Sequence, residues 1–370
     1  MISSGTPGIK PARQPAQGAL RQTRTTMKIL VIRHDNIGDL IITTPVFRAL
    51  RERFPEAQID ALVNSYNFPI LHNNPDLSRI HIYTKGKHRA PGDSLLMTHW
   101  RRFRLMLELR SMHYDTVIVA NWGYHPRLLR PARWIAPASI IGFVPARTEI
   151  PVITHGIPIN TAPRHSVEKV FFLLSPLGIE GPPPPLRLVP DAEEKRRARD
   201  LLCSQTWFRS DKTIIGVHIS SRKELQRWTR EHFSELIKRL HAKTGCQFML
   251  FWSPGDENNR MHPGDDQAAA AIIAATAGLP VLPYATGGLE TLIGGLSVCD
   301  TMICSDGGAM HVGAGLGLPI VCFFGDSNPR NWHPWGVPYE LLNPTTRNVK
   351  DITVDDAEAA FDRLLEKISG

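Results

Sequence analysis

The sequence predicts an α/β fold made of two Rossmann-like domains that face a common cleft. The chain has 370 residues, which exceeds the size at which a single hydrophobic core usually stops growing. On both sides of a proline-rich segment at 181–185, apolar runs of strand length alternate with helical patterns, as in parallel sheets with crossover helices. Each half also contains a strand that leads through a short polar loop into a helix, and the N-terminus of such a helix suits an anion.

The first domain is predicted to span 27–181. Its expected strands are short aliphatic runs at 28–33, 58–63, 79–83, 115–120 and 139–144. Helices are expected at 43–54 and 95–111, with Thr43 or Thr44 as the N-cap of the former and Pro45 in its first turn. Residues 1–26 contain basic residues and no acidic ones, so a disordered basic tail is expected there.

The run of prolines Pro182–Pro185 cannot continue a helix and stiffens the chain. We therefore expect a linker at 182–190 and a second domain at 191–350. Its expected strands lie at 213–219, 247–252, 280–282, 301–304 and 319–324. Its expected helices lie at 191–204, 230–243, 266–277, 288–298 and 307–316. A final amphipathic helix is expected within 351–370.

The charge balance favours an anionic partner. The formal net charge is +8 and the isoelectric point is near 9.4, but no recognised nucleic-acid module accompanies this charge, so nucleic acid is not the expected partner. The uncharged stretches 267–289 and 307–325 are interrupted by proline, which argues against membrane spans. Residues 1–26 lack the apolar core of a signal peptide. A cytoplasmic protein is therefore expected.

Cysteine and metal chemistry are not indicated. The five cysteines show no C-x-x-C spacing, and most lie in or beside apolar segments, so reduced thiols in the core are expected. The cysteines are Cys203, Cys246, Cys299, Cys304 and Cys322. The sequence has neither H-E-x-x-H nor a D-x-D pair, and neither a metal site nor a cofactor is predicted.

The loop at 33–39 follows the first strand and is expected at the carboxyl edge of the sheet, where ligands of open α/β sheets bind. Asp39 suits a general base that accepts a proton from a substrate hydroxyl, or a helix cap. Asp35 has the same two readings on weaker grounds. Arg33 is suited either to orienting a phosphate or to pairing with an aspartate. The loop alone does not separate these roles.

Four loops at strand ends of the second half together predict a nucleotide site. The loop 305–311 contains Asp306, which suits sugar or ribose hydroxyls, and glycines that leave backbone N–H groups accessible to a diphosphate. The loop 218–228 supplies hydrogen-bond donors and cations, 252–257 supplies an aromatic and an acidic side chain, and 323–327 is a further cleft-lining loop. The candidate donor-binding residues are Ser220, Lys223, Gln226, Arg227, Glu257, Asp306, Gly307, Gly308 and His311.

Basic residues cluster in the first half. Solvated helix faces explain them adequately, but their concentration also fits an anionic acceptor. The candidate acceptor-binding residues are Arg33, Arg101, Arg127 and Arg130.

The motifs over about residues 27–345 resemble those of glycosyltransferase family 9, the heptosyltransferases of the lipopolysaccharide core. The resemblance depends on the combination and order of several segments, none of which is specific alone. They are 28–33 with Ile37-Gly38-Asp39, Thr44-Pro45, Gln226-Arg227-Trp228, 305–311, and 319–325 with Trp332 and Pro334.

The resemblance implies a glycosyltransferase B-type fold and an inverting, metal-independent transfer from ADP-heptose to an anionic lipopolysaccharide core acceptor. It implies that Asp39 is the catalytic base, that 306–311 forms the donor loop, and that Glu257 lies near the nucleotide. The acceptor would bind the first domain. Contact with the cytoplasmic face of the inner membrane would accompany such an acceptor.

Two positions depart from the family pattern. Gln226 stands where the family often has a lysine that binds the donor phosphates, and Gly307 stands where threonine is common. Three alternatives therefore remain: transfer from another nucleotide-sugar to another glycan or protein acceptor, a non-catalytic binder of sugar nucleotide or lipopolysaccharide, and a nucleotide-sugar epimerase. An epimerase has no need for a large basic acceptor surface. Arg227 or Lys223 is expected to supply the charge that Gln226 lacks.

Overall fold

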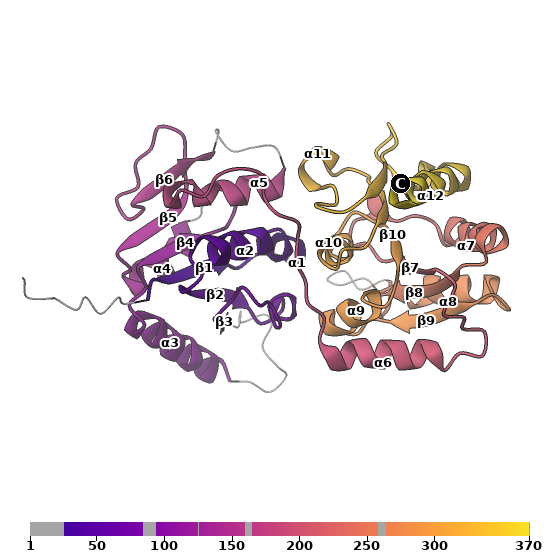
Figure 1. Cartoon of the computed structure of the whole chain (residues 1–370), viewed down its shortest axis with the longest axis horizontal. Coiled ribbons are helices and arrows are strands. Elements are labelled where there is room, and N and C mark those ends of the chain that lie inside the picture. Colours follow the sequence, from indigo (N-terminus) through magenta and orange to yellow (C-terminus); the bar gives the residue numbers. More distant parts are fainter. Residues whose placement is uncertain (1–25, 84–93, 125, 160–164, 258–263, 370) are drawn as a thin grey trace, which may run out of the picture.

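A computed structural model of the chain describes residues 26–83, 94–124, 126–159, 165–257 and 264–369. It contains two six-stranded sheets side by side (Figure 1). The strand order is β3-β2-β1-β4-β5-β6 in the first sheet and β12-β11-β10-β7-β8-β9 in the second. Counted from its own first strand, the second sheet repeats the order of the first, which is the order of dinucleotide-binding doubly wound folds. The predicted tail falls almost entirely at 1–25, outside the described residues.

All strand pairs described within the two sheets are parallel. The first sheet consists of β1 (Lys28–Arg33), β2 (Gln58–Asn64), β3 (Arg79–Tyr83), β4 (Thr116–Val119), β5 (Ser139–Val144) and β6 (His155–Pro158). The second consists of β7 (Ile214–His218), β8 (Gln247–Trp252), β9 (Val281–Ala285), β10 (Thr301–Ser305), β11 (Ile320–Phe323) and β12 (Tyr339–Leu342). The sequence did not predict β6 and β12, which are the short strands at one edge of each sheet.

Helices cover both faces of each sheet. In the first half they are α1 (Ile37–Ile41), α2 (Thr44–Arg53), α3 (Leu95–Ser111), α4 (Pro126–Ile135) and α5 (Ser166–Phe171). In the second half they are α6 (Ala192–Cys203), α7 (Arg230–Thr244), α8 (Asp266–Ala275), α9 (Leu289–Leu296), α10 (Gly308–Gly315), α11 (Pro329–Trp332) and α12 (Val354–Ser369). The short 3₁₀ turns are η1 (Phe68–Ile70), η4 (Phe172–Leu177), η5 (Glu224–Gln226) and η6 (Val349–Asp351).

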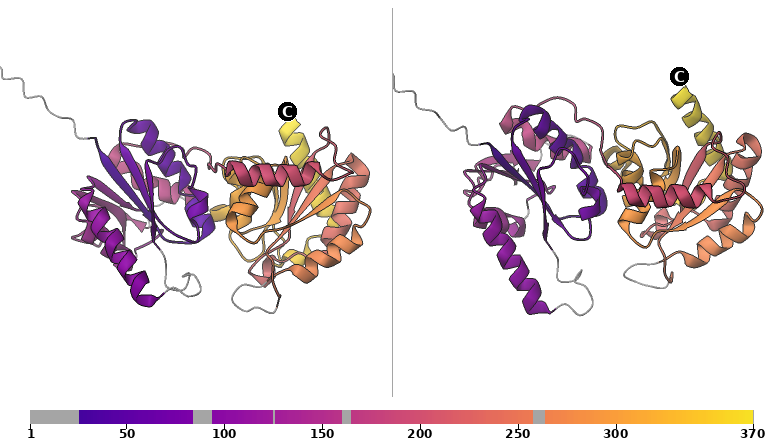
Figure 2. Two further views of the ribbon diagram at one scale, coloured as in Figure 1. Left: turned by 90° about the horizontal axis from the view of Figure 1, so that it is seen from below. Right: turned by 60° about the horizontal axis from the view of Figure 1, so that its bottom comes forward.

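The cores show which helices share a face. Buried residues of α3 and α4 pack in a separate cluster on one face of the first sheet, whereas α1, α2 and α5 pack on the other. In the second half, α7, α8 and α12 share one cluster, and α9 and α10 belong to the cluster that continues into the first half. The two halves are therefore joined through the faces that carry α1 and α10 (Figures 1 and 2).

Thr43 is the N-cap residue of α2, one of the two predicted positions, but its side chain does not cap the helix. The unpredicted helix α1 runs almost directly into α2, so Thr43 has a helical backbone and makes no side-chain cap. Its hydroxyl donates to the backbone oxygen of Asp39 at 2.9 Å, and the Thr44 hydroxyl donates to that of Ile41 at 2.8 Å. Both hydroxyls thus donate to backbone carbonyls of the preceding turn, which lie within hydrogen-bond distance.

The connector between the halves is bonded to both of them. The backbone N–H of Arg187 donates to the Thr44 hydroxyl at 3.1 Å, and that of Leu188 donates to the Gly315 carbonyl at 2.7 Å. Leu186 and Leu188 are buried. The segment is therefore a packed strap rather than a free spacer.

The prediction that the cysteines are buried is confirmed for four of the five. All five cysteines are free thiols, and all except the exposed Cys203 are buried. Burial raises the pKa of the Cys246 thiol, which favours an unreactive protonated form. In the part of the chain that the structure describes, every helix is too short or too polar to cross a lipid bilayer.

Candidate active site

The two polar loops singled out in the sequence meet where the halves join. Helix α1 follows β1 and helix α10 follows β10, and the two helices pack against each other (Figure 1). A Cβ atom on Gly38 would lie only 2.7 Å from Cδ2 of His311, and one on Gly308 would lie 3.4 Å from Cγ2 of Ile37. A side chain at position 38 would therefore clash, so glycine permits the close approach.

Asp39 lies in the first turn of α1, at the carboxyl edge of the first sheet. Its Oδ1 accepts a hydrogen bond from the Arg33 guanidinium at 3.0 Å. Its Oδ2 accepts from the backbone N–H and the side-chain amide of Asn36, each at 3.2 Å. The carboxylate thus completes a capping box. An ionised carboxylate offers about four acceptor positions, so capping leaves room for one further proton donor.

Arg33 is almost completely buried, with 1% of its side chain exposed. Its Nε lies 3.3 Å from Oδ2 of Asp35, and the guanidinium also donates to the Ala120 carbonyl. Arg33 therefore fixes Asp39 and Asp35 within the first half, which matches the ion-pair reading of the sequence.

The remaining candidate acceptor arginines lie apart from this ion pair. Arg101 belongs to α3, and Arg127 and Arg130 belong to α4, the helices that cover the opposite face of the sheet from α1. All three side chains are exposed. Both helices follow strands of a parallel sheet, so they begin at the same edge as the Asp39 loop.

Gln226 joins three of the candidate donor loops. Its amide nitrogen donates to the Asp306 carboxylate at 2.8 Å and to the Ser327 hydroxyl at 2.6 Å. Its amide oxygen lies 3.4 Å from the Ser221 hydroxyl. Gln226 and Asp306 are both buried, at 4% and 9% exposure. A neutral amide therefore lies beside the Asp306 carboxylate.

Two cations in the loop of Gln226 are paired with carboxylates. Lys223 lies 3.1 Å from Asp326, and the two side chains are 48% and 39% exposed. Arg227 lies 3.0 Å from the buried Asp265. An exposed pair of this kind is worth little, so Lys223 can exchange its partner for a phosphate more readily than Arg227 can.

Arg227 and Glu257 line a cavity whose lining does not include Asp306. The cavity has a volume of about 220 Å³ and also contacts α7 and α8. Ser220 accepts a hydrogen bond from the backbone N–H of Ser253 at 2.8 Å. The sequence pointed to these loops but missed the partners Asp265 and Ser327, since such pairings depend on loop geometry.

His311 lies between the two halves, in the first turn of α10. Its side chain is buried, and its Nδ1 has no hydrogen-bond partner among the described residues. Burial lowers the pKa of His311, and the carboxylates of Asp306 and Asp39 oppose this shift. A neutral imidazole thus lies within the electrostatic reach of both candidate carboxylates.

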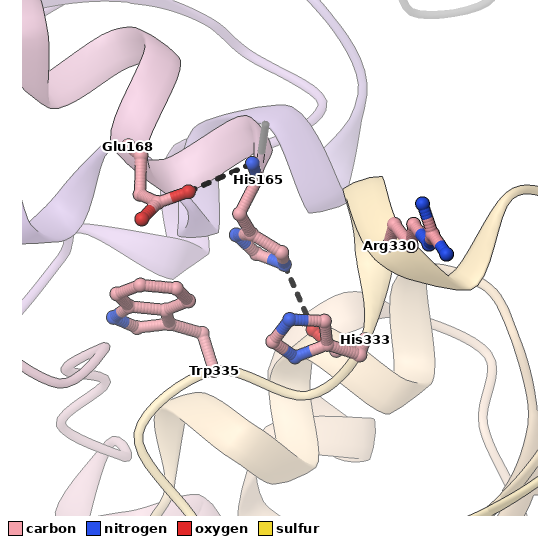
Figure 3. A pocket seen from close by; sticks show the side chains of 5 residues that line it. All are labelled: His165, Glu168, Arg330, His333 and Trp335. Carbon is pink, nitrogen blue, oxygen red and sulfur yellow. Dashed lines mark hydrogen bonds between the residues drawn. The ribbon is translucent and has the colours of Figure 1, made fainter. Parts of the chain in front are cut away.

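A second contact between the halves was not predicted. His165, at the N-terminus of α5, contacts His333 and Trp335 of the second half, and the three side chains line a cavity of about 460 Å³ (Figure 3). His165 Nδ1 accepts from the Val167 backbone N–H at 3.1 Å, so Nε2 is the atom that donates to the His333 carbonyl at 3.1 Å. Trp335 stacks on His165 with ring centroids 4.7 Å apart.

Burial lowers the pKa of His165 to about 3, with His333 as a further cause. The sequence signal for this residue was weak. Glu168 stands three positions after His165 and accepts from its backbone N–H at 2.8 Å, which is capping-box spacing with histidine in place of serine or threonine.

The described residues contain no group of three or more His, Cys, Asp or Glu side chains able to hold a metal ion.

Comparison with known proteins gives one consistent result. The model of glycosyltransferase family 9 (heptosyltransferase) matches residues 102–359. Lipopolysaccharide heptosyltransferase 2 of Salmonella typhimurium is 27% identical over 323 residues, covering 82% of this chain and 84% of that protein.

Solved structures agree on the fold. A family 9 glycosyl transferase from Veillonella parvula superposes with a TM-score of 0.77 at 20% identity, covering 92% of this chain and 97% of that one. The E. coli ADP-heptose lps heptosyltransferase II gives 0.71 at 21% identity, covering 93% and 100%. The predicted B-type fold, with its two parallel α/β sheets, is confirmed.

Proposed function

The chain belongs to glycosyltransferase family 9, and we propose that this enzyme transfers heptose from ADP-heptose to an anionic lipopolysaccharide core acceptor. The names of the heptosyltransferases in Salmonella typhimurium and E. coli support both the donor and the acceptor. We further propose that residues 27–181 bind the acceptor, that 191–350 bind the donor, and that 182–190 link them.

One observation carries the proposal: α1 and α10 pack so closely that Gly38 admits no side chain against His311. A donor held at the N-terminus of α10 would therefore lie next to the α1 loop that carries Asp39. Backbone N–H groups at a helix N-terminus bind phosphate oxygens. Gly307 supports this assignment, since a Cβ built on it meets nothing within 4 Å.

In the proposed reaction, the acceptor hydroxyl attacks the anomeric carbon while Asp39 removes its proton. The new bond joins the acceptor oxygen to the anomeric carbon on the face opposite the leaving group, so the configuration inverts. The bond from the anomeric carbon to the diphosphate breaks, and ADP carries away its electron pair. Arg33 holds Asp39 in position through the 3.0 Å ion pair.

The leaving diphosphate would be stabilised by the N–H groups of α10 and by Lys223, whose exposed pair with Asp326 opens readily. Asp306 would accept hydrogen bonds from sugar hydroxyls, with its carboxylate oriented by Gln226. His311, which is neutral because it is buried, adds no competing charge between Asp306 and Asp39. Ser220, Arg227 and Glu257 are proposed to bind the nucleoside end of the donor.

The donor is tested with a thermal-shift panel of ADP-, UDP-, GDP- and CMP-sugars. A ligand that binds only the native state raises the unfolding midpoint according to its affinity, so ADP-heptose should give the largest shift. A shift from another nucleotide-sugar, with none from ADP-heptose, would reassign the donor. The UDP-, GDP- and CMP-sugars are included because Gln226 is neutral.

Catalysis is tested separately with a mass-spectrometric transfer assay on purified core acceptor. Product carrying one added heptose is expected. Binding of donor and acceptor without product would instead identify a non-catalytic binder that has kept the fold.

A further inference from the structure

Helix α3 exposes an apolar stripe to solvent. Its inner side packs on the first sheet through Leu109, which is fully buried. Its outer side exposes four large side chains at helical spacing, namely Leu96 (83%), Trp100 (55%), Phe103 (46%) and Leu107 (44%), with Met97 (48%) beside them. A helix that is apolar on two opposite faces is expected to be covered on both.

We call these five residues, together with Trp134 of α4, the α3 patch. Each other described helix exposes at most one large hydrophobic side chain. Scattered exposed hydrophobic residues need no explanation, but a contiguous patch marks an interaction surface. No described element of the second half covers α3, which lies on the outside of the first half (Figures 1 and 2).

The aromatic side chains of the α3 patch are held in place. The rings of Trp100 and Phe103 lie 6.0 Å apart between centroids. The Arg110 guanidinium lies 5.8 Å from the ring centroid of Trp134 and donates to the Trp134 carbonyl at 2.6 Å. This contact ties α4 to α3, so that Trp134, which is 46% exposed, extends the patch.

The surroundings of the patch are strongly basic. Exposed arginines flank it on both helices, and Glu108 is the only acidic residue within α3 and α4. These arginines are Arg101, Arg104, Arg110, Arg127, Arg130 and Arg133. Tryptophan and arginine beside an aliphatic stripe suit the boundary between lipid headgroups and acyl chains, where indole rings locate and arginines reach anionic headgroups.

We propose that the α3 patch docks this enzyme on an anionic lipid surface. The charge of the patch surroundings indicates a lipid partner. Many arginines with almost no acidic residues among them complement a surface of anionic headgroups, which all carry the same charge. A second copy of the chain would bring the same arginines face to face, which costs free energy.

Helix α3, which carries most of the patch, is connected to the candidate active site through Arg102. The guanidinium of Arg102 lies 4.8 Å from the ring centroid of Tyr83, and Tyr83 stacks on His34 at 5.1 Å. His34 directly precedes the Asp35 to Asp39 loop. Docking through α3 would therefore bring this loop near the membrane surface, where a lipid-linked acceptor is presented; this last step rests on the proposed function.

The test uses the full chain in flotation with vesicles of phosphatidylcholine alone or with added phosphatidylglycerol. We expect binding to the anionic vesicles that weakens with salt. Trp100→Ser/Phe103→Ser should lower the partition coefficient about tenfold, since it removes two apolar anchors. Its matched control is Leu201→Ser/Ile368→Ser, which removes two side chains of 43% exposure on α6 and α12 and should leave binding unchanged.

A charge variant tests the second part of the proposal. Arg104→Gln/Arg133→Gln should weaken binding to the anionic vesicles about 25-fold, which is about fivefold for each arginine near the surface. The matched control is Arg196→Gln/Arg199→Gln on α6, whose arginines are also exposed. Equal binding of the wild type and both patch variants would overturn the proposal. Failure of the wild type to float with the anionic vesicles would also overturn the proposal. If, in that case, the apolar variant dissociated a dimer, the patch would be a contact between two copies of the chain.

Transfer assays separate this inference from the proposed function. With a delipidated acceptor in solution, Trp100→Ser/Phe103→Ser should retain wild-type turnover, whereas transfer to acceptor embedded in vesicles should fall. Soluble transfer by a wild type that does not bind the vesicles would overturn the docking surface alone. Vesicle binding without any transfer would overturn the proposed function alone.

Discussion

Among single side chains, Asp39 is the one whose replacement tests the chemistry most directly. Asp39→Asn keeps an oxygen that can accept from the Asn36 backbone N–H, now at 3.2 Å, so α1 should still be capped. The amide cannot remove a proton, and we expect turnover to fall about 10²- to 10⁴-fold. Mass-spectrometric transfer assays measure this loss, with the thermal unfolding midpoint as a check on folding.

The matched control is Asp35→Asn, since Asp35 lies in the same loop and contacts the same arginine, at 3.3 Å. It should retain most activity. Wild-type turnover in both Asp39→Asn and Asp39→Ala would show that another group accepts the proton.

Gln226 provides a second test at the residue scale. Gln226→Lys places an ammonium where the amide now lies 2.8 Å from Asp306, and this charge should attract the donor diphosphate. We expect the Kd for ADP to fall about threefold to tenfold, as measured by calorimetry. Gln226→Met, which has neither charge nor amide, should bind ADP less tightly than the wild type. Weaker binding by the lysine variant would mean that the diphosphate lies elsewhere.

At this scale the sequence predicted the loops better than the pairings. The alternative that Arg33 pairs with an aspartate is what the structure has, since both residues belong to one short loop. The bond from Gln226 to Asp306 joins residues 80 positions apart, and its geometry depends on how three loops fold together. The roles of these residues in catalysis and donor binding remain predictions.

Between elements, the contact of α1 with α10 makes an unusual prediction. Alanine in place of glycine usually stabilises a helix by up to about 1 kcal/mol. At position 38 the new Cβ would lie 2.7 Å from His311, so Gly38→Ala should instead destabilise the protein by about 1–3 kcal/mol through overpacking. Urea unfolding measures the change.

Gly287→Ala is the matched control, because a Cβ there meets nothing within 4 Å. The double variant Gly38→Ala/His311→Ala should recover part of the loss, since it removes the clashing ring. If Gly38→Ala stabilised the protein, the close packing of α1 on α10 would be contradicted.

The elements themselves were largely predictable. The strands β1, β3, β5 and β8 begin and end at the predicted residues, because most residues of each strand are apolar and the segments beside them are polar. By contrast, β6 contains Gly156 and Pro158, which weaken a strand signal and are tolerated at a sheet edge. Helix α1 has five residues, too few for helical periodicity to be detected.

Across the whole molecule, two of the contacts between the halves differ in their chemistry. One is the contact of α1 with α10, which carries the candidate active site. The other is the stack of His165 on Trp335, with the bond from His165 to the His333 carbonyl at 3.1 Å (Figure 3). Because this bond needs the neutral form with hydrogen on Nε2, and Nδ1 already accepts from Val167, protonation of His165 would replace an acceptor by a second donor.

This arrangement predicts a dependence of stability on pH. The pKa of His165 is about 3 in the folded protein, below its ordinary value of 6.5. Between about pH 3 and pH 6.5 the unfolded chain binds more protons than the folded one. The free energy of unfolding therefore increases as the pH rises through this range and decreases as the pH falls. Between about pH 7.5 and pH 5 the loss attributable to His165 should be about 2 kcal/mol.

The comparison protein is His165→Asn, because asparagine caps α5 without titrating. It should be less stable than the wild type near neutral pH, since the bond to His333 is altered, but its stability should fall less on acidification. His218, whose pKa burial lowers to about 4, is present in both proteins and cancels in the difference. Urea unfolding at about pH 7.5 and pH 5 measures how the free energy of unfolding of each protein changes with pH. Equal changes in the two proteins would mean that His165 is not held neutral at this contact and that acid destabilises the protein through other groups.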